Sequence, residues 1–290
     1  MLSGELISGR GVASAIDGRT ARQVETLAAA DLHASLAVVH VGDDAGAGSY
    51  RKTIAQRAGR LGIQVHQIAL DHDTRPAGMR AVLDSLAEEA RINGILVQTP
   101  LSPELRHVVT CCLPPRKDVE GITPGQLGRL LLGEPEILPC TAAAVTALIQ
   151  SRIPNVAGCR VVIVNNSPTV GRPLLHVLLQ RGATVTVCAS HTLDLARETR
   201  RAEVLVTAIG SPNYFGADYV APGTLVIDVG INLAEDGRSI VGDVDRDAVL
   251  PIASGLTAVP SGVGPVTTAM LFANVVELAR IQHGLPRQPS

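Results

Sequence analysis

Short apolar runs alternate along the first part of the chain with longer stretches rich in Ala, Arg, Glu and Leu. The runs are S-L-A-V-V-H-V (35–41), I-Q-V-H-Q-I-A-L (63–70) and G-I-L-V-Q (94–98). Such runs are typical of strands, and the stretches between them have helical composition. The pattern predicts a β-α-β-α-β order and hence a parallel sheet. Ligands of parallel sheets bind beyond the carboxyl ends of the strands, so the residues after Val41 and Val97 are site candidates by position.

A second series of the same kind starts near Cys159. Its expected strands are R-V-V-I-V (160–164), T-V-T-V-C (184–188), V-L-V-T-A-I-G (204–210) and T-L-V-I-D-V-G (224–230), and a final helix is expected over about 267–282. Between the two series, L-P-C-T-A-A-A-V-T-A-L-I-Q (138–150) predicts a helix with Thr141 as its cap. The fold class is therefore α/β, with a second doubly wound unit.

Composition narrows the class of protein. Of the 290 residues, 46% are hydrophobic but only 2% are aromatic, so Val, Leu, Ile and Ala must fill the core, as in parallel sheets buried on both faces. The formal net charge is -2, without a block of like charge, which disfavours nucleic acid and anionic membranes as partners. A small molecule is the better expected partner.

The sequence predicts neither a membrane span nor a signal peptide, and we expect a cytoplasmic protein. The five cysteines form no C-x-x-C pair, and no spacing typical of metal ligands is present. No metal is therefore expected.

The segment R-V-V-I-V-N-N-S-P-T-V-G-R-P (160–173) runs from an expected strand through a polar turn into a helix. A helix N-terminus favours a bound phosphate, but the turn lacks G-x-G-x-x-G, and only Gly171 stands where helix and strand approach closely. A plain turn and a nucleotide site both fit. After the next strand no carboxylate is present to bind ribose hydroxyls, which favours a 2'-phosphate near Ser190 and His191. A solvated loop histidine is the alternative for His191.

Several segments match one family collinearly. They are V-G-D-D (41–44), G-I-L-V-Q-T-P-L (94–101), D-V-E-G (118–121), G-R-L (128–130), P-C-T (139–141), S-P-T-V-G-R-P (167–173), D-V-G-I-N (228–232), V-G-D-V-D (241–245) and P-S-G-V-G-P-V-T (260–267). Together they resemble the bifunctional methylenetetrahydrofolate dehydrogenase/methenyltetrahydrofolate cyclohydrolase enzymes. The resemblance implies two α/β lobes around a cleft and commonly a homodimer. It assigns folate to residues 1–141, with a helix over about 267–290 returning to them, and NADP to a Rossmann-like domain over 142–266.

The family's folate-side signature is only partly present. It combines a tyrosine, a lysine four residues later, a glutamine and two aspartates. Tyr50, Gln98 and Asp118 match and are the expected catalytic residues, whereas Ile54 stands in place of the lysine. Residues four apart share a helix face, so a lysine at 54 would lie beside the tyrosine, while Lys52 points to roughly the opposite face. The resemblance implies that this lysine polarises the one-carbon bridge and assists attack by water. We therefore expect a working dehydrogenase with a lost or impaired cyclohydrolase.

The resemblance also implies two sets of binding residues. Those expected to contact the folate are Tyr50, Gln98, Pro100, Leu101, Glu120, Gly262, Pro265 and Thr267. Those expected to contact NADP, with NAD as the alternative, are Thr141, Asn165, Asn166, Ser167, Val170, Gly171, Arg172, Ser190, His191, Gly210, Gly230 and Ile231. Residues 262–267 are expected to form a glycine-proline loop that touches both ligands.

Two of these positions depart from the family. Glu120 replaces an aspartate and can reach the pterin's donor edge with one extra methylene, or it is a plain turn residue. Asn166 replaces an arginine that would grip a 2'-phosphate, and Arg172 is the nearest candidate to compensate.

Three functions remain open at this point. The first is the NADP-dependent dehydrogenase with an impaired cyclohydrolase. The second is a related one-carbon enzyme with an altered substrate. The third is a folate- or nucleotide-binding protein without turnover, which the departures at Ile54 and Asn166 also fit.

Overall fold

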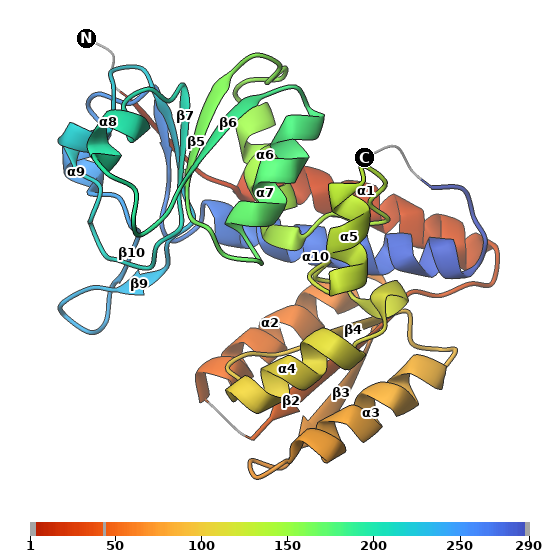
Figure 1. The fold of residues 1–290 in the computed structure, drawn as a ribbon. Coiled ribbons are helices and arrows are strands. Elements are labelled where there is room, and N and C mark those ends of the chain that lie inside the picture. Colours follow the sequence, from red (N-terminus) through yellow and green to blue (C-terminus); the bar gives the residue numbers. More distant parts are fainter. Residues whose placement is uncertain (1–3, 43–44, 288–290) are drawn as a thin grey trace. The chain divides into compact units, whose positions relative to one another are not determined.

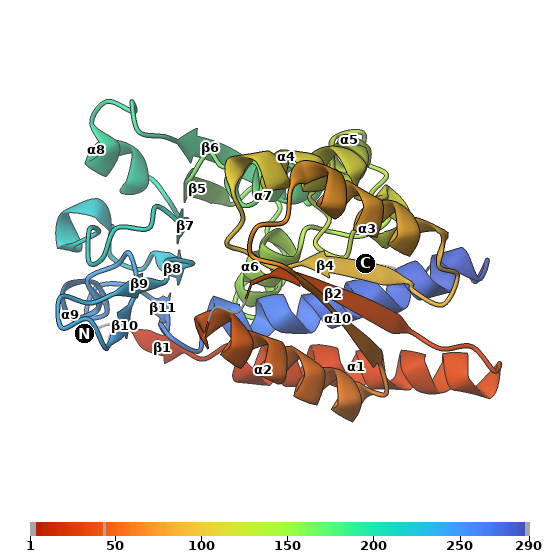
Figure 2. The same cartoon turned by 90° about the horizontal axis from the view of Figure 1, so that it is seen from below.

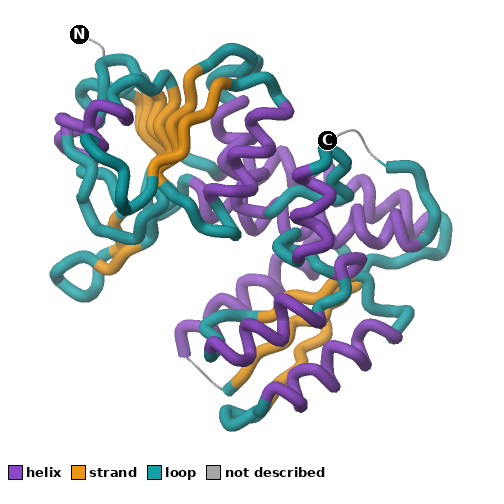
Figure 3. The backbone as a smooth tube through the Cα atoms, viewed as in Figure 1, coloured by secondary structure: helices purple, strands orange, loops and turns teal. Residues whose placement is uncertain are grey.

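The structure is a computed structural model that describes residues 4–42 and 45–287, with the backbone alone for residues 45–47, 49 and 50. The chain forms two compact units, each made of two stretches of sequence. One unit contains residues 15–140 and 271–290, and the other contains residues 1–14 and 141–270. We call them the 15–140 unit and the 141–270 unit. Each contains its own parallel sheet (Figures 1 and 3).

The 15–140 unit is built on a sheet with the strand order β3-β2-β4. The bounds are β2 (Ser35–Val41), β3 (Gln64–Leu70) and β4 (Gly94–Val97). Its helices are α1 (Arg10–Ala29), which starts in the other unit, α2 (Ala45–Leu61), α3 (Pro76–Glu88), α4 (Pro103–Cys112), α5 (Pro124–Leu131) and the later part of α10 (Val263–Gln282). Helices α3 and α4 cover one face of the sheet, and α1, α2 and α10 lie on the other (Figure 2).

The packing of the 15–140 unit follows from its aliphatic sequence. Met79 and Leu83 of α3 pack against Ala37, Val39 and Ile95 of the sheet, and all five are almost fully buried. At the other face, a Cβ added at Gly94 would lie 3.5 Å from Cγ2 of Val275 in α10. Strands β2 and β4 are thus buried on both faces, which explains why they read as continuous apolar runs.

The 141–270 unit is built on a six-stranded parallel sheet with the order β1-β11-β8-β7-β5-β6. The strands are β1 (Glu5–Ile7), β5 (Arg160–Val164), β6 (Thr184–Cys188), β7 (Val204–Thr207), β8 (Leu225–Asp228) and β11 (Gly255–Thr257), and a separate hairpin pairs β9 (Asn232–Leu233) with β10 (Ile240–Val241). The helices are α6 (Cys140–Gln150), α7 (Gly171–Gln180), α8 (Leu195–Thr199) and α9 (Arg246–Val249). Short 3-10 turns lie at Pro115–Lys117 in the other unit and at Ala217–Tyr219 here.

The seven expected strands are all present, and the α/β class with a doubly wound parallel sheet is confirmed. The prediction missed both β1 and β11, which join this sheet at one edge. It also placed the start of the last helix too late, since α10 begins at Val263. Among the described residues, no helix has the length and apolarity that a membrane span requires.

Gly94 offers a test of the packing between β4 and its neighbours. An added Cβ would overlap the Val119 side chain, so Gly94→Ala should lower the free energy of unfolding by about 1–3 kcal/mol. The matched control is Gly59→Ala in α2, where nothing lies within 4 Å of the added Cβ and helix propensity predicts a gain of about 0.5–1 kcal/mol. Urea unfolding followed by circular dichroism measures both. A neutral Gly94→Ala would contradict this account of the packing.

Candidate functional site

The candidate folate residues of the 15–140 unit start where β4 ends. The backbone N–H of Gln98 donates to Val39 O at 2.8 Å, so Gln98 continues the pairing of β4 with β2. Its side chain is buried, with 8% exposed. The Thr99–Pro100 peptide bond is cis, Pro100 is exposed, and Leu101 packs against the core beneath α3 and α4. These residues lie at the edge where parallel sheets bind ligands.

Asp118 organises the neighbouring turn. Its buried carboxylate accepts hydrogen bonds from Gly121 N at 3.0 Å and Thr123 N at 2.7 Å, and its backbone bridges to Ile95 of β4. Burial raises the pKa of Asp118, and the bonds from Thr123 and Gly121 oppose that shift. In this structure the carboxylate therefore shapes the loop that carries Glu120.

Glu120 has the most perturbed carboxyl group of this loop. Burial, and then the charge of Asp118, raise the pKa of Glu120 to about 7. A carboxyl group with this pKa exchanges a proton near neutral pH and can donate or accept a hydrogen bond. Near neutral pH, the Glu120 side chain can therefore act either as a donor or as an acceptor.

Asn274 of α10 holds the same loop, and the sequence predictions missed it. Its amide donates to Val119 O at 2.9 Å and to Leu138 O at 3.0 Å. The sequence feature that could have indicated Asn274 is its position as a lone amide in the apolar run M-L-F-A-N-V-V (270–276). Cys140 lies beside it, and its thiol donates to Val119 O at 3.3 Å. Burial and the nearby carboxylates raise the pKa of Cys140, so this thiol stays protonated.

Helix α2 carries the position where the sequence departs from the family that it resembles. Ile54 is fully buried, with 0% of its surface exposed, whereas Lys52 is exposed on the same continuous helix. The two side chains therefore lie in different environments, as expected for residues two apart in a helix. Tyr50 lies in α2, but its side chain is outside the described residues, as are Asp43 and Asp44 of the V-G-D-D segment.

In the 141–270 unit, Asn165 organises the loop between β5 and α7. Its Oδ1 accepts hydrogen bonds from Ser167 N, Ser167 Oγ and Gly171 N at 2.7–2.9 Å, and its Nδ2 donates to Ala208 O at the end of β7. Val170 N donates in turn to Ser167 Oγ at 3.1 Å. A Cβ at Gly171 would overlap the backbone of Asn165, so only glycine fits this close approach. The side chain of Asn165 is thus used to shape the turn.

Arg172 lies beside Asn166. Its Nε donates to Asn166 Oδ1 at 3.1 Å in an exposed position at the start of α7. After β6, Ser190 and His191 lie in an exposed turn that the bond from Ala189 N to Thr192 Oγ1 closes at 2.8 Å. The loop after β5 thus presents the cationic Arg172. The loop after β6 presents Ser190 and His191, with Asp194 at its far end. The guanidinium of Arg172 suits a nucleotide with a 2'-phosphate.

Two buried aspartates fix the loops after β7 and β8. Asp243 accepts hydrogen bonds from Ile209 N, Gly210 N and Ser211 N at 2.6–3.2 Å. Asp228 accepts bonds from the backbones of Gly230, Asp243 and Val244 at 2.9–3.1 Å. Burial raises the pKa of Asp228 to about 6, although these bonds oppose the shift. The sequence predictions assigned neither aspartate, although both occur in D-V-G-I-N and V-G-D-V-D.

These aspartates place two expected nucleotide residues. Gly230 is buried against Asp243, with no room for a Cβ, and Ile231 beside it is 69% exposed. Gly210 has a positive φ of 70°. The glycines let the backbone turn tightly around the carboxylates and leave Ile231 projecting from the surface.

Two expectations about loops and caps were wrong. The glycine-proline loop ends at Gly262, and Pro265 and Thr267 lie in the first turns of α10, where Thr267 Oγ1 donates to Val263 O at 3.2 Å. Proline fits there because the first helical N–H groups have no intrahelical partner. Thr141 is not a cap, since α6 already begins at Cys140, directly after Pro139 with its fixed φ.

Comparison with known proteins agrees with this arrangement. A family model described as "Tetrahydrofolate dehydrogenase/cyclohydrolase, catalytic domain" matches residues 7–120, and its NAD(P)-binding counterpart matches residues 139–283. A "Bifunctional protein FolD" of Parafrankia sp. is 42% identical over 277 residues, covering 94% of this chain and 98% of its own. The chain therefore belongs to the tetrahydrofolate dehydrogenase/cyclohydrolase family.

Solved structures give the same result. The bifunctional FolD methylenetetrahydrofolate dehydrogenase/cyclohydrolase of Campylobacter jejuni has a TM-score of 0.90 and 35% identity, over 95% of this chain and 98% of its own. The enzyme of Trypanosoma brucei, solved with NADP and an inhibitor, has a TM-score of 0.90 and 30% identity, over 97% of this chain and 99% of its own. The predictions of an enzyme of this family and of an NAD(P)-binding domain are confirmed.

Glu120 makes stability depend on pH. Its pKa is about 7 in the folded chain, against an ordinary value of 4.5, so the folded state keeps a proton that the unfolded state has lost between these values. The free energy of unfolding should therefore fall as pH rises through this window, and Asp228 contributes with the same sign.

Glu120→Gln should make this decline shallower between about pH 5 and pH 7, because it removes the titrating proton. The control is Glu134→Gln at an exposed glutamate of the same unit, which should leave the slope unchanged. Urea unfolding midpoints across this range measure the effect. Identical slopes for Glu120→Gln and the parent protein would show that Glu120 does not titrate there.

Proposed function

We propose that this protein oxidises 5,10-methylenetetrahydrofolate to 5,10-methenyltetrahydrofolate with NADP, and that the following hydrolysis to 10-formyltetrahydrofolate is lost or impaired. Family membership supports the reaction and the cofactor class. The observation that carries the second half is Ile54, buried in α2 one helical turn after Tyr50.

The two reactions place different demands on position 54. Hydrolysis requires water to lose a proton as it attacks the methenyl carbon, so a positioned group with a donor or a base accelerates it. Isoleucine has neither a donor nor a base. Lys52 is exposed two residues before Ile54 in α2, so it points to a different face of the helix. Loss of hydride from a methylene carbon between two nitrogens gives a cation that the nitrogen lone pairs stabilise. That step needs alignment of the reactants more than proton transfer.

The remaining folate residues suit alignment. We assign Gln98 to orient the one-carbon bridge, Tyr50 to stack on the pterin, and Glu120 to bond its donor edge, with Asp118 shaping the turn beneath. The buried Gln98 and the bonds from Gly121 and Thr123 to Asp118 support these roles. We assign Pro100 and Leu101 to the wall of the same site.

NADP, when bound, supplies the hydride acceptor. We assign its 2'-phosphate to Arg172. This arginine lies beside Asn166, the residue that replaces the arginine of the family. A guanidinium binds phosphate bidentately, and the asparagine lacks that charge. Ser190 and His191 are further candidates for this phosphate, and the backbone near Gly210, Gly230 and Ile231 is assigned to the nicotinamide side.

We also propose a homodimer in the cytoplasm. Leu233 and Ile240, in the hairpin of β9 and β10, are exposed apolar side chains that a second copy would cover. The five cysteines are free, which suits a reducing compartment.

Ile54→Lys should restore hydrolysis of the methenyl compound, because it places an amino group, which can donate a hydrogen bond or, when neutral, accept a proton, one turn after Tyr50. Hydrolysis is measured as the loss of methenyl absorbance after subtraction of the buffer rate, and an increase of about a hundredfold is expected from one general acid–base group.

Burying a lysine at this position carries a desolvation cost, so Ile54→Met is the matched control. The methionine variant should keep dehydrogenase activity without gaining hydrolysis. Dehydrogenase activity of Ile54→Lys reports that the variant is folded. If that activity is intact and hydrolysis stays at the parent rate, Ile54 is not the cause of the loss.

Arg172→Gln should lower kcat/KM for NADP about tenfold, because a charge-assisted bidentate contact is lost, and should leave kcat/KM for NAD nearly unchanged. The ratio of the two constants is its own control for general damage. An equal loss with both nucleotides would show that Arg172 acts on the loop rather than on the 2'-phosphate.

Two other outcomes would replace this proposal. Folate binding without turnover under either nucleotide would favour a binding protein, consistent with the departures at Ile54 and Asn166. Turnover only with another one-carbon substrate would favour an enzyme of altered specificity.

A further inference from the structure

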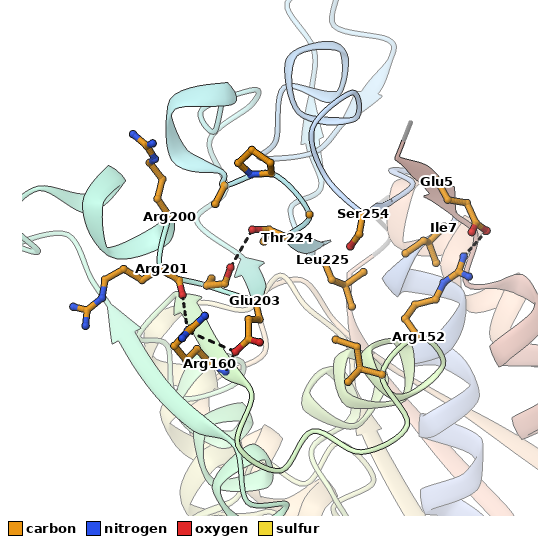
Figure 4. Close-up of a pocket in the computed structure, with 16 residues that line it drawn as sticks. Glu5, Ile7, Arg152, Arg160, Arg200, Arg201, Glu203, Thr224, Leu225 and Ser254 are labelled. Carbon is orange, nitrogen blue, oxygen red and sulfur yellow. Dashed lines mark hydrogen bonds and ion pairs between the residues drawn. The ribbon is translucent and has the colours of Figure 1, made fainter. Parts of the chain in front are cut away.

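A pocket of about 700 Å³ opens along the amino-terminal edge of the six-stranded sheet (Figure 4). Its lining includes the first residues of β1, β5, β8 and β11 and the residue before β7. All its residues belong to the 141–270 unit. Volumes of 300–1,000 Å³ are typical of small-molecule sites.

The pocket is separate from the nucleotide loops. Arg160 begins β5, and the loop at Asn165 follows the end of the same strand. The rise of an extended strand puts roughly 13 Å between the two ends of β5. Nucleotides bind at the carboxyl ends of such strands, so the amino-terminal edge carries no part of that site.

The lining is rich in arginine. Arg152, Arg160, Arg200 and Arg201 line the pocket against two glutamates, in a chain whose formal net charge is -2. Figure 4 shows two ion pairs on opposite sides of the pocket, Arg160 with Glu203 and Arg152 with Glu5. Arg201 also pairs with Glu198, which does not line the pocket, so the local excess is one positive charge, and it favours an anionic ligand.

Arg160 is held in place through Nε of its guanidinium. Its Nε contacts Arg201 O at 3.2 Å and Glu203 Oε2 at 3.6 Å. Among the described residues these contacts use Nε, which leaves the two Nη groups to bind a ligand. The side chains of both ion pairs are between 35% and 64% exposed, and solvent-accessible pairs contribute little, so an anion can share their arginines at small cost.

Between the two ion pairs the floor contains aliphatic side chains, with Thr224 and Ser254 beside them. Ile7 and Leu225 are buried there, each with 4% exposed, and Figure 4 shows Leu225 between the arginines and Ile7 next to Arg152. An apolar floor with a cation at each side fits a molecule with an anionic group at each end and an apolar middle.

We propose that this pocket binds a small organic dianion whose two anionic groups reach Arg160 and Arg152 across the apolar floor. Carboxylates and phosphates both match a guanidinium fork, so the shared chemistry is two anionic oxygen groups joined by an apolar spacer. The site is additional to the folate and nucleotide sites and does not depend on the proposed activity.

Calorimetric titration of the full chain tests the proposal with adipate, suberate and hexane-1,6-bisphosphonate, each with and without saturating NADP. We expect one dianion per chain, bound about tenfold more tightly than hexanoate because a second charge-assisted contact is made. The bisphosphonate arm shows whether phosphate is preferred over carboxylate. Binding that NADP abolishes would place the anion in the nucleotide site and overturn the proposal, as would no binding of any dianion.

Variants locate the site. Arg160→Gln and Arg152→Gln should each weaken the tightest dianion about tenfold. Glu5→Gln should tighten it roughly threefold by releasing Arg152 from its pair, a gain that a purely structural role would not give. The control Arg80→Gln, at an arginine paired with Asp84 in the other unit, should change nothing. Parent-like binding by both pocket arginine variants would contradict the proposal.

Discussion

Buried and half-buried side-chain oxygens that accept backbone N–H bonds hold the loops of both units in place. Asp118 does this after β4, Asn165 after β5, Asp243 after β7 and Asp228 after β8. Each loop would otherwise leave its N–H groups without partners next to an apolar sheet, at a cost of about 1–3 kcal/mol for each group. The same bonds force glycine at positions such as Gly171 and Gly230, where a Cβ would overlap the acceptor residue. The candidate binding surfaces are therefore rigid backbone turns set by a few polar residues.

The proposed loss of hydrolysis without loss of the dehydrogenase is consistent with this arrangement. The turns that place Gln98, Glu120 and the nucleotide loops do not use position 54 in any of the bonds described above. Ile54 is buried in α2, so the substitution leaves an apolar core contact in place of a polar group. Hydride transfer depends on the preserved alignment, whereas attack by water depends on a proton-handling side chain. In the turn that Asp118 organises, Glu120 has a pKa of about 7 and can exchange a proton near neutral pH.

The sequence predicted the larger elements well because buried parallel strands such as 35–41 and 160–164 read as continuous apolar runs. It missed β1 and β11 because three residues show no periodicity, and their pairing is a long-range contact. The matching motifs brought out most candidate residues, yet the oxygens that shape the loops were harder to recognise. The sequence alone does not distinguish a buried aspartate that accepts three N–H bonds from an aspartate that binds substrate. Asn274 and the arginine pocket likewise depend on residues far apart in the chain.

The stoichiometry of the first turnovers tests the central claim most directly. The protein is incubated with methylenetetrahydrofolate and NADP, and reduced nucleotide and methenyl product are quantified together, with the uncatalysed hydrolysis rate subtracted. A dehydrogenase with an impaired cyclohydrolase accumulates the two in equal amounts. Reduced nucleotide without methenyl product would mean that water attacks efficiently in the absence of a lysine at position 54, which contradicts the account.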